Sequence, residues 1–166
     1  MVCYSGGGHT RVLAHEIAAQ CGADIDEIKD RVGRRGLTGY LRSVLESLLC
    51  LPAPIDGSRR EPGQYDTVII GTPVWSGRMA SPVRAYLRRH RGEFRRVAVF
   101  CTATRGGQAS VLDDVARLAG CRAAATLALT ESEVALRRHW AAVTKFVRSV
   151  RRARGNPGAA EREAAA

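Results

Sequence analysis

Ser5, His9 and Thr10 carry hydrogen-bonding side chains in the stretch SGGGHT near the start of the chain, which also contains three successive glycines. Glycine permits a positive φ and lets backbone N–H groups approach a ligand that a Cβ atom would obstruct. Apolar residues from Leu13 to Cys21 then recur at helical spacing. The unpaired N–H groups and the positive dipole end of that helix would face the glycines, so residues 5–10 are predicted to bind a phosphate group.

The spacing of this stretch differs from three common phosphate loops. A Walker-type loop needs a lysine, but the first lysine of the chain is Lys29. A dinucleotide fingerprint would use Gly6 and Gly8 but meets Arg11 where its third glycine belongs. A cysteine-based phosphatase loop would need an arginine closer to Cys3. The stretch SGGGHT instead resembles the S/T-x-T-G-x-T loop that binds the phosphate of FMN in flavodoxins, and also the glycine loop of some UDP-sugar transferase subunits.

Strand-like and helix-like segments alternate along the chain. Continuous or short apolar runs predict strands, and apolar residues at i, i+3, i+4 spacing predict helices between them. The predicted strands are 1–4, 23–28, 68–70, 97–100 and 123–128, and the predicted helices are 10–21, 38–49, 81–90, 111–119 and 140–150. This alternation predicts one α/β domain over residues 1–152 with a parallel sheet covered on both faces, followed by a disordered tail over 153–166.

Three glycine-bearing loops follow the first, third and fourth predicted strands: Ser5–Thr10, Thr72–Met79 and Thr102–Gln108. Ligands of such sheets bind at the carboxyl ends of the strands, where the strand order reverses. The segment GTPVWSGRMASPV in the second loop resembles the flavin-contacting segment of the flavodoxin family. The three loops also occur in the order and at the separations found in that family, and the resemblance covers residues 1 to about 150.

The resemblance implies a flavodoxin-like doubly wound, five-stranded parallel sheet of order 2-1-3-4-5, with FMN as the cofactor. Trp75 would stack on the isoalloxazine ring, while Ser76 and Gly77 would offer backbone groups near its N5 atom. The implied phosphate contacts are Ser5, Gly6, Gly7, Gly8, His9 and Thr10. The implied ring contacts are Pro73, Val74, Trp75, Ser76 and Gly77, followed by Thr102, Ala103, Thr104, Arg105, Gly106 and Gly107 along the pyrimidine edge.

The chain departs from the family pattern in two loops. Gly7 stands where the family has a hydroxyl residue, so one phosphate donor is lost, and His9 is the expected replacement. A hydrogen bond to a charged group contributes roughly 1.5–3 kcal/mol, so weaker FMN binding is expected. Residues 101–108 contain no aromatic side chain to cover the second ring face. That face is expected to remain open for a substrate.

Composition limits the remaining function classes. The 166 residues, 45% of them hydrophobic, are enough for one domain, and no apolar run approaches the roughly 20 residues of a membrane span. The N-terminus lacks the pattern of a signal peptide, so a cytoplasmic location is expected. The net charge is +10, but the aromatic content of only 5% argues against nucleic-acid binding. The sequence leaves the oligomeric state open.

The cysteines, the other histidines and the second tryptophan carry no chemical motif. Five cysteines without a C-x-x-C pair are expected to be reduced and to pack as small hydrophobic residues. His15, His90 and His139 have no partners at metal-ligand spacing, so neither a metal site nor a catalytic residue is predicted. Trp140 lies at helical spacing with Val143 and is expected in the core.

Three functions remain open. The first is an FMN oxidoreductase that transfers two electrons from NAD(P)H or a reductase to a small quinone-like acceptor. Arg78 and Arg105 near the ring favour it, because positive charge stabilises the anionic reduced flavin. The second is a non-catalytic electron carrier of the flavodoxin type, which would act on a redox partner protein. The third is a nucleotide-sugar-binding, glycosyltransferase-like domain, which leaves the Pro73–Trp75 segment unexplained.

Overall fold

The computed structural model describes residues 1–30, 53–56 and 59–155. The helix expected from Thr38 to Leu49 lies outside the described residues, as do Cys50 and the predicted tail beyond residue 155. No helix in the described part of the chain is long and apolar enough to cross a membrane.

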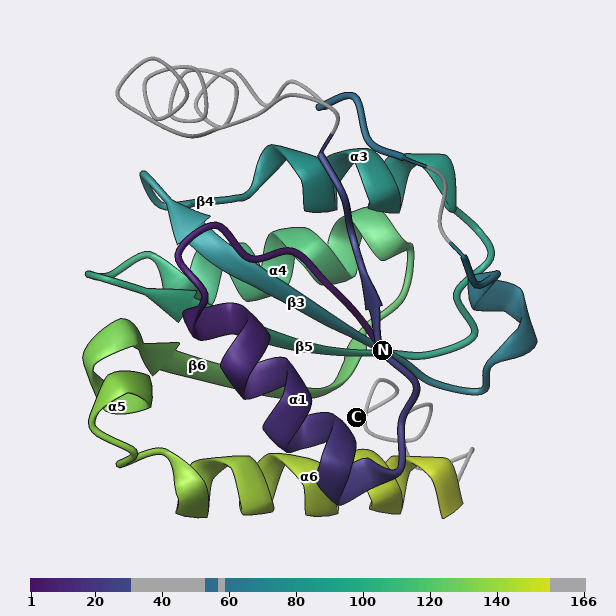
Figure 1. Ribbon diagram of the computed structural model, residues 1–166. Coiled ribbons are helices and arrows are strands. Elements are labelled where there is room, and N and C mark those ends of the chain that lie inside the picture. The colour runs from purple at the N-terminus through teal and green to yellow at the C-terminus, as the bar shows by residue number, and fades with distance from the viewer. Residues whose placement is uncertain (31–52, 57–58, 156–166) are drawn as a thin grey trace.

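A parallel sheet forms the centre of the molecule (Figure 1). Its strands lie in the order β2-β1-β3-β5-β6, and β4 pairs only with β3, in antiparallel orientation. With this short hairpin strand set aside, the order is the expected 2-1-3-4-5, so the prediction of a flavodoxin-like fold is confirmed. The strands are β1 (Val2–Cys3), β2 (Asp26–Glu27), β3 (Val68–Trp75), β4 (Arg78–Met79), β5 (Val97–Ala103) and β6 (Ala123–Thr130).

Helices cover both faces of the sheet (Figure 1). The apolar sides of α1 and α6 pack on one face, and those of α3 and α4 pack on the other. This arrangement follows from right-handed crossovers between parallel strands. The helices are α1 (His9–Cys21), α3 (Ser81–Arg89), α4 (Gln108–Ala119), α5 (Glu131–Ala135) and α6 (Trp140–Gly155), and a 3₁₀ turn, η1, spans Pro62–Gln64.

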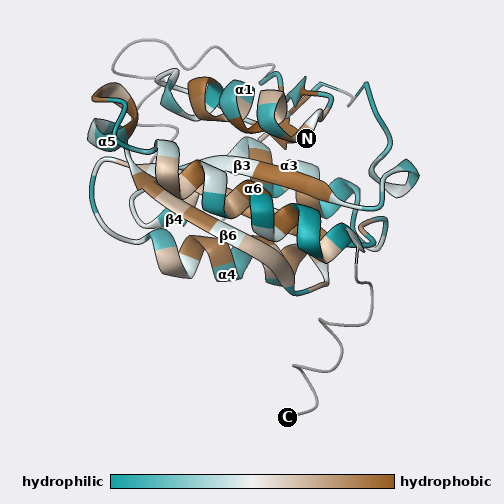
Figure 2. Cartoon of the chain, turned by 90° about the horizontal axis from the view of Figure 1, so that it is seen from below, coloured by the Kyte–Doolittle hydropathy of each residue, from teal (hydrophilic) through white to brown (hydrophobic). Residues whose placement is uncertain are grey.

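The interior strand β3 is buried on both faces from residue 68 to residue 73, whereas the edge strand β6 alternates buried and exposed residues over much of its length. Apolar residues of both strands are brown in Figure 2. Every residue of β5 is buried. Gly71 is required in β3 because a Cβ atom there would lie 2.2 Å from Cζ of Phe100 on β5. Cys3 and Cys101 are buried free thiols in the core, and burial raises the pKa of each to about 12. These two cysteines therefore pack as small hydrophobic residues, as predicted.

Three strands, β3, β5 and β6, are longer than predicted, and β5 continues past its predicted end at residue 100 to Ala103. β3 continues beyond Gly71 to Trp75, because Thr72 and Pro73 pair with β5 and the last two residues, Val74 and Trp75, pair with β4. Pro73 has no N–H group, but β1 pairs with β3 only at Ile70 and Gly71, so few ladder bonds are lost. β6 likewise pairs with β5 as far as Thr130.

The prediction that Trp140 is a core residue is wrong, since its side chain is 60% exposed. Trp140 is the first residue of α6, and the preceding His139 occupies the interior, with only 2% exposure. The predicted buried face begins instead at Val143 and continues through Val150. The last residue of α6 is Gly155, so helical structure continues past the domain limit expected at residue 152.

Candidate functional site

The side chain of Ser5 stabilises the first loop by hydrogen bonds to its backbone. Its Oγ atom accepts hydrogen bonds from the N–H groups of Gly8 at 3.1 Å and Arg11 at 3.2 Å. Gly8 precedes α1 with a φ of 96°, a conformation that side chains disfavour. The N–H groups of His9 and Thr10 lie before the first backbone hydrogen bond of the helix, which joins Val12 to Gly8. The loop thus leads into a helix N-terminus whose first N–H groups have no intrahelical partner, as an anion site requires.

His9 lies beside Gly7, the residue that stands where the flavodoxin pattern has a hydroxyl group. A Cβ atom at Gly7 would be 3.8 Å from Nδ1 of His9. This Nδ1 atom is buried, and it has no hydrogen-bond partner among the described residues. It lies 3.9 Å from Oε2 of Glu131. His9 therefore has a polar atom available at the position where a donor was expected.

Thr10 joins the first loop to the third. Its Oγ1 atom lies 2.7 Å from Oγ1 of Thr102, and both residues are buried. The hydrogen bond holds the first turn of α1 against the end of β5. Thr10 is therefore fixed by a partner 92 residues away, a contact that no local sequence signal contains.

The predicted aromatic loop is a hairpin between β3 and β4. Trp75 pairs with Arg78, and the turn residues Ser76 and Gly77 have φ values of 49° and 72°. Positive φ at both turn positions matches the right-handed twist of a two-residue hairpin. The hairpin therefore sets the direction of Trp75 at the end of β3.

The indole of Trp75 packs over the start of the first loop. Its ring meets Tyr4 edge to face, with centroids 5.6 Å apart. A Cβ atom at Gly6 would lie 3.2 Å from Cζ2 of the indole, which is shorter than an ordinary van der Waals contact. The phosphate loop and the aromatic hairpin are thus in direct contact, and glycine at position 6 permits this approach.

The third loop touches the hairpin through two glycines. A Cβ atom at Gly107 would lie 2.8 Å from Cα of Gly77, and Gly107 has a φ of 97° as the residue preceding α4. No other residue type fits both constraints. Gly77 also lines a cavity of about 340 Å³, which is within the range of small-molecule sites.

Many, but not all, of the predicted ring contacts line this cavity. Its lining consists of Val74, Trp75, Ser76, Gly77, Thr104, Arg105, Gly106 and Glu131. Pro73, Thr102 and Ala103 do not line it, because they are buried strand residues. Gly107 is also absent from the lining and instead approaches Gly77. Residues 5–10 adjoin it through the Gly6–Trp75 and His9–Glu131 approaches. The structure thus brings the three predicted loops together at one edge of the sheet.

Glu131 is a site residue that the sequence analysis missed. Its Oε2 atom accepts a hydrogen bond from Oγ1 of Thr104 at 3.1 Å. Glu131 is the first residue of α5 and follows the end of β6. The predicted last strand ended at residue 128, so its carboxyl end was assigned to the wrong residues. Glu131 could have been found from the sequence if the residues after the last predicted strand had also been considered, because ligands bind at the carboxyl ends of the strands.

The charge of the cavity differs from that expected. Arg78 is exposed on β4 and does not line the cavity, whereas Arg105 does. Glu131 adds a negative charge to the same lining. The site therefore holds one arginine and one carboxylate instead of two arginines. The formal charges of Arg105 and Glu131 offset each other in this lining, although the net charge of the chain is +10.

A second cavity, of about 320 Å³, lies at the opposite end of the sheet. It is lined in part by Met1, Asp24 and Thr67, which precede β1, β2 and β3. Ligands of open α/β sheets bind at the carboxyl ends of the strands. The cavity beside Trp75 is therefore the candidate functional site.

Three solved structures share this fold. A flavoprotein from Lactobacillus acidophilus NCFM in complex with FMN has 26% sequence identity, a TM-score of 0.63, and covers 80% of this chain and 93% of its own. A candidate flavoprotein from Bacteroides eggerthii has 19% identity, a TM-score of 0.66 and coverages of 86% and 94%. Another, from Bacteroides uniformis, has 17% identity, a TM-score of 0.67 and coverages of 80% and 92%. The structural neighbours are thus flavoproteins that span nearly the same length.

No protein-family model matches the chain, and no curated protein matches it.

Proposed function

We propose that this chain binds FMN and acts as a flavodoxin-like oxidoreductase. The observation that carries the proposal is the convergence of a helix N-terminus, an indole and two glycine loops at one cavity. The FMN complex of the similar Lactobacillus flavoprotein supports the choice of ligand. FMN is preferred to FAD because the described residues contain one such phosphate loop, residues 5–10, and no second nucleotide-binding half.

The residues present fit each part of FMN. The N–H groups of the α1 N-terminus would bind the phosphate, with the buried Nδ1 of His9 as an additional polar contact. The cavity beside Trp75 would hold the ring, and Ser76 and Gly77 would present backbone groups along one edge. Thr104, Arg105 and Gly106 would line the other edge.

Bound FMN supplies reversible transfer of one or two electrons, which the side chains of this protein cannot perform themselves. Arg105 would favour the anionic reduced flavin and attract an anionic donor such as the phosphate of NAD(P)H. The third loop offers no aromatic side chain above the ring, which leaves space for a flat, quinone-like acceptor. We therefore prefer two-electron transfer from NAD(P)H or a reductase to such an acceptor.

The second candidate is an electron carrier. Glu131 favours it, since a carboxylate beside the ring disfavours the reduced anion and lowers the reduction potential. A redox titration distinguishes the two: a very negative second reduction step supports the carrier, and a single two-electron step supports the reductase.

The binding proposal is tested by tryptophan fluorescence, because the chain has only two tryptophans. Trp75 lines the cavity, and Trp140 is exposed at the start of α6. FMN should quench the emission of a Trp140→Phe variant, whose remaining indole is Trp75. It should quench that of a Trp75→Phe variant much less. Equal quenching in both variants, or no binding of FMN by the parent, would contradict the proposed site.

A further inference from the structure

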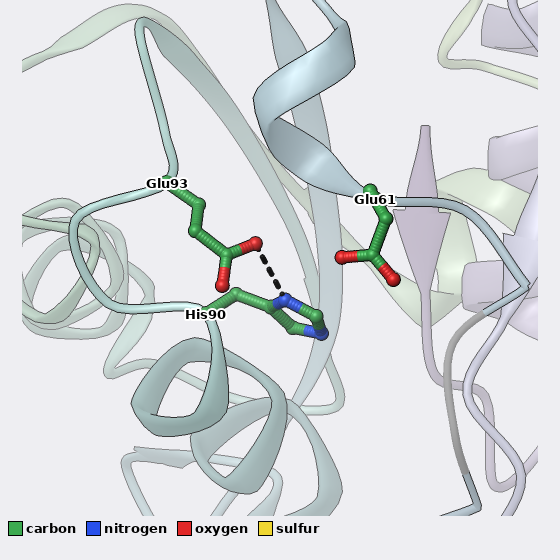
Figure 3. A group of neighbouring side chains, drawn as sticks. All are labelled: Glu61, His90 and Glu93. Atoms are coloured by element: carbon green, nitrogen blue, oxygen red, sulfur yellow. Dashed lines mark hydrogen bonds and ion pairs between the residues drawn. The ribbon is translucent and has the colours of Figure 1, made fainter.

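A cluster of metal-ligand side chains lies away from the cavity, between η1 and the end of α3. It consists of Glu61, His90 and Glu93, each of which offers one ligand atom, and these atoms lie within 4.8 Å of one another. Figure 3 shows the His90 ring between the two carboxylates. His90 and Glu93 precede β5, so the cluster lies at the amino ends of the strands, opposite the proposed flavin site.

The backbone holds the three residues in place. Glu93 N–H donates to the carbonyl of His90 at 3.0 Å, in a turn that contains Gly92 with a φ of 86°. The η1 turn packs against this segment, since a Cβ atom at Gly63 would lie 3.7 Å from the carbonyl oxygen of Glu93. The ligand atoms are therefore brought together by main-chain structure and do not depend on flexible side chains alone.

His90 faces Glu93 of the cluster through its Nδ1 atom. Its side chain is buried, and Nδ1 lies 2.9 Å from Oε2 of Glu93. Its Nε2 atom is also buried and has no hydrogen-bond partner among the described residues. A metal ion bound with Glu93 as a ligand would take the place of the proton between Nδ1 and Glu93, so Nδ1 is the ligand atom of His90 and Nε2 keeps the N–H group of the ring.

We propose that Glu61, His90 and Glu93 bind one divalent transition-metal ion, with Zn²⁺ as the preferred ion. One imidazole nitrogen and two carboxylate oxygens match the ligand types of zinc sites that use three protein ligands and water. Tetrahedral ligands about 2.1 Å from zinc are roughly 3.4 Å apart, so the cluster must contract. Glu61 is exposed and can move inward. The two carboxylates supply local negative charge in a chain whose net charge is +10.

The bound ion would connect η1 to the end of α3 and so stabilise the fold. The full chain, treated with EDTA and desalted, should bind one Zn²⁺ ion by calorimetry. At a Zn²⁺ concentration of about 100 times the dissociation constant, the unfolding temperature should rise by roughly 5–10 °C. Absence of binding and of any thermal shift would overturn the proposal.

Glu61→Gln is the sharpest variant, because it removes an exposed ligand and leaves the His90–Glu93 contact intact. It should weaken Zn²⁺ binding at least about tenfold. The matched control is Asp66→Asn, an exposed carboxylate shortly after η1 that pairs with Arg95, and it should bind as the parent does. Equal affinity in Glu61→Gln and the parent would assign the ion elsewhere.

Cysteine thiolates are the competing ligands, since Cys21 and Cys121 are half-buried free thiols. Cobalt(II) distinguishes the two kinds of site by its absorption spectrum. A nitrogen and oxygen site should show weak visible bands only. A strong sulfur-to-cobalt charge-transfer band in the near ultraviolet would place the ion on cysteine and overturn the proposal.

Discussion

The hydroxyl oxygens of Thr10 and Thr102 lie 2.7 Å apart in the interior, where they join the N-terminus of α1 to the end of β5. If Thr102 donates to Thr10, the hydroxyl hydrogen of Thr10 remains available to an anion at the first loop. The pair can therefore serve both the fold and the proposed phosphate site.

Replacing Thr10 with Val should weaken FMN binding by roughly 1–3 kcal/mol, because a hydrogen bond to a charged group is lost. Thr102→Val leaves the Thr10 hydroxyl in place and should weaken binding less, so it is the matched control. Flavin affinity is measured by fluorescence titration of both variants. Unchanged affinity in Thr10→Val would mean that this hydroxyl has only a structural role.

Replacing Glu131 with Gln should raise the reduction potential of bound FMN, since it removes a negative charge from the cavity. Two unit charges about 4 Å apart in water interact by roughly 1 kcal/mol, which corresponds to about 20 mV for a two-electron couple. Potentiometric titration measures the shift. Asp66→Asn removes an exposed carboxylate at the opposite end of the sheet, before β3, and should leave the reduction potential unchanged. An unchanged potential in Glu131→Gln would place the ring away from this carboxylate.

Replacing Gly71 with Ala should destabilise the protein without touching the cavity. The added Cβ atom would lie 2.2 Å from Cζ of Phe100, so β3 and β5 could keep their pairing only if the ring moved. Overpacking of this kind costs about 1–3 kcal/mol or more. Urea denaturation measures the free energy of unfolding. A Gly71→Ala, Phe100→Leu double variant should recover part of the loss, and failure to recover it would contradict the steric explanation.

His139 should make stability depend on pH. Its two ring nitrogens face acceptors, the carbonyl of Glu133 and the carboxylate of Glu16. Burial lowers the pKa of His139, but these two hydrogen bonds and the charge of Glu16 outweigh it, so the pKa is raised.

A raised pKa means that the folded state binds the proton more tightly than the unfolded state does. The resulting stabilisation is complete below the unfolded pKa of about 6.5 and is lost as pH rises through the higher folded value. The difference in the free energy of unfolding between the parent and His139→Gln should therefore decrease as pH increases from about 6 to 9. Urea denaturation across this interval checks the prediction, and a constant difference between the two proteins would contradict it.

The sequence by itself determined the fold class and the three loops of the candidate site. Both follow from local signals: apolar periodicity identifies strands and helices, and the SGGGHT stretch identifies the first loop. Because parallel strands place their carboxyl ends at one edge, three loops that follow strands were expected to meet. The structure brings Trp75, Gly77 and Gly107 together there.

The tertiary structure alone decided which side chains face the cavity and which residues meet across the chain. β3 continues past Gly71 because β5 pairs with it as far as Pro73 and β4 pairs with Val74 and Trp75. Glu131 reaches the cavity through pairing of β6 with β5, and Trp140 is exposed because His139 takes the interior position. Glu61 and His90 are far apart in sequence, so their spacing could not predict a shared metal ion. Contacts between distant segments depend on packing energies that no local pattern contains.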